Sequence, residues 1–242
     1  MKNKALGDDS LKKSLGVLGG MGSLATADFL HKVIEYTYVE HESDHLHIYA
    51  DIYPQIPDRV DALLHGGPSP APAMIEALKK LESCGAEIVV MPCITAHNFH
   101  DELFEVAAVP FPNFPEIVAK ACEKNYGNKT AAVLSTEATL KMRTILDKLD
   151  GEGVPYITPD KEEQDIITGL IYAVKTNKDM GAVVEKFQII LNQMKARGAE
   201  YFVLGCTELP VIGDVCASDY EFLNVTSELA KAAIELCGGK LK

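Results

Sequence analysis

Short apolar runs alternate with longer amphipathic stretches along this chain. Runs typical of buried or half-buried strands occupy residues 14–18, 45–53, 87–91, 130–134, 201–204 and 222–225. Helical patterns occupy residues 26–39, 72–83, a stretch from about 96, 137–149, 162–175, 180–197 and 226–236. Strands that alternate with helices predict an α/β fold, in which parallel sheets are flanked by helices.

One segment of the chain occurs twice. Residues 83–95 read SCGAEIVVMPCIT, and residues 196–208 read ARGAEYFVLGCTE. Both copies have a glycine at the end of a helix, then a short apolar run, then a cysteine and polar residues. Each cysteine therefore lies just past a strand's carboxyl end, where open α/β sheets bind ligands. We expect Cys93 and Cys206 to face one site, an arrangement suited to moving a proton across a substrate.

The duplication predicts two pseudo-symmetric domains with the active site in the cleft between them. We place residues 1–110 and 222–242 in an N-terminal domain that carries Cys93, and residues 111–221 in a second domain that carries Cys206. The boundary falls in VPFPNFP (109–115), which interrupts regular structure. The last helix is expected to return to the first half. The proline- and glycine-rich stretch 54–72 is expected to be a long loop.

Composition narrows the possible partners and the compartment. The net charge is −12 without a block of like charges, which argues against nucleic acid and anionic membranes. No apolar run approaches the length of a membrane span, and residues 1–14 are polar, so we expect a short disordered lead-in without a signal peptide. Six cysteines in such a chain predict free thiols in the cytoplasm. Cys84, Cys122, Cys216 and Cys237 are expected to be structural.

Four motifs, in order, resemble those of the aspartate/glutamate racemase family. They are GVLGGMGSLAT (16–26), PDR (57–59), MPCITAH (91–97) and LGCTELP (204–210), and PDR is similar to the segment found in aspartate racemases. The resemblance implies racemisation of a small amino acid, aspartate or glutamate, by two cysteine bases and without a cofactor. One cysteine removes the α-proton while the other delivers a proton to the opposite face. The resemblance also implies a homodimer.

Two basic residues are candidates for binding an acidic substrate. Arg59 lies in PDR, and a guanidinium binds a carboxylate through two parallel hydrogen bonds. Lys175 ends the helical pattern IITGLIYAVK, about where aspartate racemases carry a substrate-binding lysine. A lysine at this position also suits the helix dipole, so a purely structural role stays open.

The remaining candidates lie in the glycine loop and around the cysteines. The opening loop places Met21 and Gly22 at the substrate. Thr95 and Thr207 offer hydroxyl donors, and backbone N–H groups after each cysteine can bind a carboxylate. Glu208 is expected to tune the Cys206 thiol or to bind the substrate ammonium, although capping a helix start is an equal alternative.

The chain departs from the family at two positions. Ile94 stands directly after the first cysteine, where the family typically has asparagine. Val60 stands after PDR, where threonine is usual. Either substrate binding is rearranged, or the substrate differs from aspartate. His97 belongs to the first cysteine motif and is expected to support its geometry.

Two alternatives remain open at this point. GGMGSLA (19–25) has the spacing of a dinucleotide loop, with Asp51 as a ribose partner, which would make the protein a nucleotide-dependent oxidoreductase. A non-catalytic, two-lobed binding protein for small ligands would also explain the duplication, but not the paired thiols. The histidines include no complete set of metal ligands, so we expect neither a metal nor another cofactor.

Overall fold

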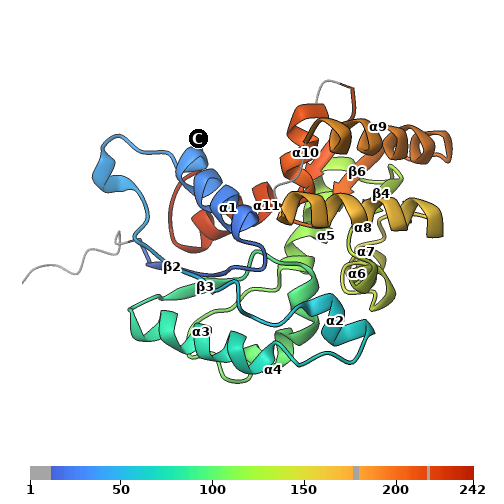
Figure 1. The fold of residues 1–242 in the computed structure, drawn as a ribbon. Coiled ribbons are helices and arrows are strands. Elements are labelled where there is room, and N and C mark those ends of the chain that lie inside the picture. Colours follow the sequence, from blue (N-terminus) through green and yellow to red (C-terminus); the bar gives the residue numbers. More distant parts are fainter. Residues whose placement is uncertain (1–11, 177–179, 217–218) are drawn as a thin grey trace, which may run out of the picture.

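The computed structural model describes residues 12–176, 180–216 and 219–242 (Figure 1). Most of the predicted lead-in, residues 1–11, lies outside the described residues. Within the described part, no helix is both long enough and apolar enough to cross a membrane.

The strands form two parallel sheets, as the sequence predicts. The first sheet has the order β2-β1-β3, with β1 at Leu15–Gly19, β2 at Ile48–Ile52 and β3 at Ile88–Val90. The second has the order β5-β4-β6-β7, with β4 at Ala131–Leu134, β5 at Tyr156–Ile157, β6 at Tyr201–Leu204 and β7 at Phe222–Asn224. The α/β prediction is confirmed.

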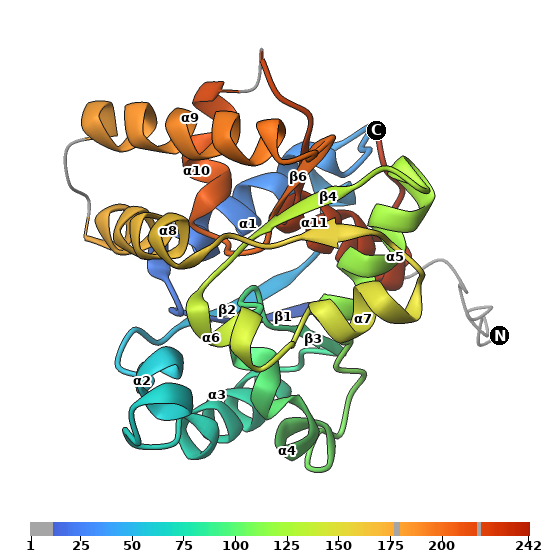
Figure 2. The same ribbon diagram turned by 90° about the vertical axis from the view of Figure 1, so that its right-hand side faces the viewer.

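Helices form a shared layer between the sheets and separate layers outside them (Figure 2). The shared layer contains α1 (Ser23–Tyr36), α5 (Phe114–Tyr126), α7 (Leu146–Gly151) and α11 (Val225–Leu236). Outside the first sheet lie α3 (Ala71–Ser83) and α4 (His100–Phe104). Outside the second lie α8 (Lys161–Lys175), α9 (Met180–Ala196) and α10 (Leu209–Cys216). Both sheets are therefore buried on both faces, which explains their continuous apolar runs.

The sequence repeat is also a structural repeat. Gly85 and Gly198 end their helices with φ of +101° and +102°, a conformation that favours glycine. Glu87 and Glu200 each accept a hydrogen bond of 2.8 Å from the backbone N–H of the residue before the neighbouring strand. The two halves thus present their cysteines from equivalent positions, after β3 and after β6.

The predicted long loop contains a helix, so that prediction is wrong in its middle. α2 (Arg59–Leu64) begins after Asp58, whose carboxylate accepts hydrogen bonds from the backbone N–H groups of Val60 and Asp61. An aspartate before an apolar stretch is a helix-start pattern. The surrounding prolines and glycines obscured it.

Two predicted helices are broken in the structure. The helix expected over 137–149 is two helices, α6 (Glu137–Lys141) and α7, because Arg143 adopts a φ of +56° between them. The helix expected from about Ala96 begins as the 3₁₀ helix η2 (Thr95–Phe99) before α4. The sequence did not predict the short strand β5, the helix α10 or the 3₁₀ helix η1 (Glu42–Asp44).

The end of the chain belongs to both halves. β7 pairs with β6, so residues 222–224 belong to the second sheet. α11 then packs against α1 and α5, and Thr37 and Leu241 form an antiparallel bridge. The return of the last helix to the first half agrees with the expectation.

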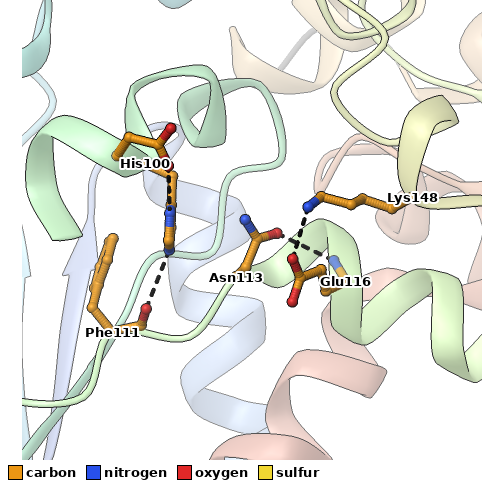
Figure 3. Close-up of polar contacts among 6 residues, drawn as sticks. His100, Phe111, Asn113, Glu116 and Lys148 are labelled. Carbon is orange, nitrogen blue, oxygen red and sulfur yellow. Dashed lines mark hydrogen bonds and ion pairs between the residues drawn. The ribbon is translucent and has the colours of Figure 1, made fainter. Parts of the chain in front are cut away.

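The first crossing between the halves is held by side-chain contacts (Figure 3). His100 Nε2 lies 3.2 Å from the carbonyl of Phe111, and Asn113 caps α5 by accepting from the N–H of Glu116. The Glu116 carboxylate accepts a hydrogen bond of 2.7 Å from Lys148 on α7. This ion pair lowers the pKa of Glu116 and joins the start of α5 to the second half.

Candidate active site

Cys93 and Cys206 line the same small cavity at the carboxyl ends of the two sheets. They follow β3 and β6 and are 7% and 6% exposed. The cavity, which we call the inner chamber, has a volume of about 10 Å³, room for about one water molecule. Its lining is Met21, Asp58, Arg59, Val60, Cys93, Ile94, Thr95, Thr136, Lys175, Cys206, Thr207 and Glu208.

A larger cavity adjoins the inner chamber. This outer chamber measures about 350 Å³ and shares four lining residues with the inner one, Asp58, Arg59, Lys175 and Glu208. Gly22 lines the outer chamber together with Gly20 and Pro54. All the residues that the sequence nominated therefore meet at the two chambers. Gly22 lies at the outer one, and the other candidates lie at the inner one.

The Cys206 thiol is held by a carboxylate. Its Sγ donates a hydrogen bond of 2.9 Å to Oε2 of Glu208. Burial raises the pKa of Cys206 well above its ordinary value, and the negative Glu208 raises it further, whereas Lys175 opposes the shift. Burial and the hydrogen bond to Glu208 both favour the protonated thiol of Cys206.

Lys175 supplies a half-buried positive charge. It ends α8, and its Nζ lies 5.4 Å from the centre of the Tyr172 ring. Burial alone would lower its pKa, but Glu208 and the two cysteine thiols raise it more, so the net shift is upward. The lysine therefore keeps its positive charge. This charge lies at the boundary between the inner and the outer chamber.

Arg59 is a helix residue and not a residue of a covering loop. It is the first residue of α2 and is only 7% exposed. Its guanidinium donates to the carbonyls of Ile56, Pro57 and Met21 at 3.1–3.4 Å. Nε is buried and has no hydrogen-bond partner among the described residues. Three carbonyls thus fix the guanidinium at the boundary of both chambers and leave two of its five N–H donors, one of them Nε–H, for a ligand.

The hydroxyl groups in the inner chamber are partly engaged with one another. Thr95 Oγ1 lies 2.9 Å from the hydroxyls of both Thr136 and Thr139. Thr136 lines the inner chamber and caps α6, and the sequence prediction missed it. It follows β4 as Cys206 follows β6, so the strand-end rule applied to β4 would have found it.

His97 supports the first cysteine segment as a neutral ring. Its Nε2 lies 3.2 Å from the carbonyl of Met91, two residues before Cys93. Burial lowers the pKa of His97 to about 3, and nearby His100 adds to the effect. The ring is therefore uncharged at neutral pH and packs with Phe111 and Phe114.

The glycine loop does not resemble a nucleotide site in its surroundings. A side chain on Gly22 would come within 2.8 Å of Glu208 Oε1, so a carboxylate occupies the region where a pyrophosphate would need positive charge. Asp51, the expected ribose partner, is instead paired with Lys80 at 3.2 Å. No group of three potential metal-ligating side chains occurs in the part of the chain that the structure describes.

Comparison with known proteins identifies the family. Residues 18–233 match the model of the Asp/Glu/hydantoin racemase family. The chain belongs to this family. It is therefore an isomerase, an amino-acid racemase, and neither an oxidoreductase nor a non-catalytic binding protein.

Individual relatives agree with this assignment. The chain is 28% identical over 226 residues to the broad specificity amino-acid racemase RacX of Bacillus subtilis, which covers 91% of this chain and 96% of that protein. The structure of Picrophilus torridus aspartate racemase is similar with a TM-score of 0.87 and 32% identity, over 95% of this chain and 96% of that one. Glutamate racemase from Francisella tularensis, at 14% identity, shares the fold with a TM-score of 0.67 over 93% of this chain and 81% of that one.

Proposed function

We propose that this racemase interconverts L- and D-aspartate, or the enantiomers of glutamate, with Cys93 and Cys206 as its two bases. The observation that carries the proposal is the inner chamber, where two thiols meet two cations, the buried Arg59 and the half-buried Lys175. An acidic amino acid has two carboxylates, so the cations match its charges.

Binding requires the inner chamber to open. Pockets that hold small molecules measure about 300–1,000 Å³, a size the outer chamber reaches and the inner one does not. The wall between the chambers consists of Asp58 and Arg59 from the first half and Lys175 and Glu208 from the second. We infer that an amino acid enters the outer chamber and reaches the thiols when this wall parts.

The reaction then moves one proton across the α-carbon. The thiolate of one cysteine takes the α-proton, and the thiol of the other donates its proton to the opposite face, which inverts the configuration. Because the hydrogen bond to Glu208 favours a protonated Cys206, we propose that Cys93 is the base for the enantiomer whose α-proton faces it. Arg59, Lys175 and the hydroxyl of Thr207 supply the positive charge and hydrogen bonds that stabilise the carbanion-like transition state.

A less acidic substrate is the second candidate. Val60 and Ile94 line the inner chamber with apolar branches, where the family has polar side chains. RacX, a relative, is a racemase of broad specificity. An apolar wall of this kind favours acceptance of neutral side chains beside the first thiol.

A panel of L-amino acids in heavy water tests the proposal. We expect deuterium at the α-carbon and formation of the D-enantiomer with aspartate or glutamate, without pyridoxal phosphate, nucleotide or metal, and after dialysis against a chelator. Faster exchange with neutral amino acids would support the second candidate. Exchange that depends on an added cofactor would contradict both. We further propose that the protein works as a cytoplasmic homodimer.

A further inference from the structure

A racemase with two thiol bases has to reset itself after each conversion. This requirement rests on the proposed function. The cycle begins with one thiolate and one thiol, and it ends with these states exchanged. Before the same enantiomer can react again, the cysteine that donated must regain a proton and the other must lose one. A route to solvent for each buried thiol therefore affects the turnover rate.

Glu208 lies where it can connect the Cys206 thiol with solvent. One carboxylate oxygen, Oε2, accepts from the thiol at 2.9 Å. The other, Oε1, is buried and has no hydrogen-bond partner among the described residues. The residue is 2% exposed and lines both the inner and the outer chamber. It therefore connects a reacting sulfur with the larger cavity.

The lining opposite Oε1 is a glycine. A Cβ atom on Gly22 would lie 2.8 Å from Oε1, so only glycine leaves space beside this buried oxygen. Gly22 lines the outer chamber, whose volume of about 350 Å³ is large enough for several water molecules. Cys93, by contrast, lines the inner chamber and is not among the residues that line the outer one.

We propose that Glu208 is a proton relay that returns protons to Cys206 from water in the outer chamber between turnovers. After Cys206 has given its proton to the α-carbon, its thiolate lies beside the Glu208 carboxylate. The carboxylate accepts a proton from water at Oε1, the carboxyl group rotates to bring this proton to the sulfur, and the proton passes to the Cys206 thiolate. An O–H bond of water breaks, an S–H bond forms, and the carboxylate is restored. The hydroxide left in the outer chamber is neutralised by the proton that Cys93 releases to solvent in the same reset.

The charges around the pair favour this step. A thiolate and a carboxylate in contact repel each other in a buried site, so the pair binds one shared proton strongly. Lys175 and Arg59 face the same region and offset part of the negative charge, and Asp58 adds to it. The two cations lower the free-energy cost of the doubly deprotonated Cys206–Glu208 pair. The repulsion within the pair favours uptake of the replacement proton.

The Glu208→Gln variant separates the relay from the chemical step. The amide keeps the shape and a hydrogen bond to Cys206 but cannot carry a proton. With enzyme in excess, we expect one conversion at a rate within about threefold of wild type. In steady state we expect a loss on the order of 10²-fold, the size of a lost acid–base group. Formate or imidazole, which are small enough for the outer chamber, should restore part of the steady-state rate.

A matched control lies at the other end of the same strand. Glu200 precedes β6, is exposed and accepts a hydrogen bond from Thr130, so Glu200→Gln removes a carboxylate away from both chambers. We expect wild-type rates and no rescue. All variants are measured with whichever amino acid the wild type racemises fastest, so the result does not depend on the substrate being acidic.

Two results would overturn the relay. Steady-state turnover of Glu208→Gln at the wild-type rate would show that Cys206 regains its proton by another path. Loss of the single conversion as well, with no rescue by small acids, would place Glu208 in binding or chemistry instead. Failure of wild type to act on aspartate or glutamate would refute the proposed substrate class alone.

Discussion

The two cysteines occupy equivalent positions in the fold but differ in their surroundings. Cys206 donates to Glu208, two residues further along the chain, and is followed by the α-helix α10. Cys93 is followed by Ile94 and a 3₁₀ helix, and its segment is supported by a neutral histidine. The backbone repeat thus places two thiols symmetrically, while the residues after them give each thiol its own environment.

This difference teaches that symmetry of the reaction does not require symmetry of the site. The two enantiomers are mirror images, but the chain that binds them is not. In the proposed mechanism, a protonated Cys206 beside the Glu208 carboxylate is one resting state, with Cys93 as the proton acceptor. Equivalent function in both directions then depends on how rapidly the protons redistribute.

The largest expected effect comes from removing either thiol. Cys93→Ala and Cys206→Ala should each lower racemisation by on the order of 10³-fold or more, because each face needs its own proton donor or acceptor. Each variant should still exchange the α-proton of one enantiomer in heavy water, and a different enantiomer for each. Cys84→Ala is the control, since this exposed thiol lies outside both chambers. Full turnover by either site variant would refute the two-base mechanism.

The next effect concerns the positive charge that Arg59 supplies to the site. Arg59→Leu should reduce kcat/KM for aspartate by roughly ten- to a hundred-fold, the equivalent of about 1.5–3 kcal/mol for a lost charged hydrogen bond. A neutral amino acid should lose much less. Measuring kcat/KM for both substrates with wild type and variant tests this difference in loss. Equal losses would mean that the guanidinium does not bind the side-chain carboxylate.

A smaller effect should appear in the acidity of the thiols. Glu208 raises the pKa of Cys206 through its charge and its hydrogen bond. Glu208→Gln removes the charge, so the Cys206 pKa should fall and its thiolate should form at lower pH. Alkylation by iodoacetamide as a function of pH, in a Cys93→Ser background, reports the shift. A profile that stays in place, as expected for Glu200→Gln, would show that Glu208 does not tune this thiol.

The smallest expected effect is at Ile94, the residue that distinguishes the Cys93 side from the family. Ile94→Asn should raise kcat/KM for aspartate several-fold, because an amide donates a hydrogen bond where isoleucine cannot. The side chain is only 2% exposed and packs in the core, so the change should also lower stability by about 1–3 kcal/mol.

Kinetics with both enantiomers of aspartate and glutamate, together with thermal unfolding, separates the two consequences. Ile94→Val serves as the control, since it keeps an apolar surface and costs about 0.5–1.5 kcal/mol. Lower activity of the asparagine variant on aspartate would show that the pocket is built around isoleucine for another substrate.

The sequence predicted the strands other than β5, and the positions of the cysteines, because both follow from local pattern. Apolar runs identify buried strands, and the repeat identified the ends where the cysteines lie. Arg59 and Lys175 were recognisable only through the family resemblance, since nothing local separates them from surface cations.

The remaining features depend on contacts between distant parts of the chain. Thr136 enters the site because β4 neighbours β6, which the strand order determines and no local pattern reveals. The break at Arg143 follows a backbone conformation that ordinary residues seldom adopt. The Cys206–Glu208 hydrogen bond depends on burial, so the sequence left open whether Glu208 has a functional role, as a tuner of the thiol or a binder of the ammonium, or caps a helix start.

The position of α11 determines how late in synthesis the first half of the molecule can complete its fold. This helix packs against α1 in the shared layer, although the two are separated by almost the whole chain. A ribosome therefore releases the first sheet and α1 long before their apolar cover is synthesised. During that interval the nascent first half exposes side chains such as Val33, a state that favours aggregation or chaperone binding. Both halves can therefore finish folding only after α11 has emerged from the ribosome.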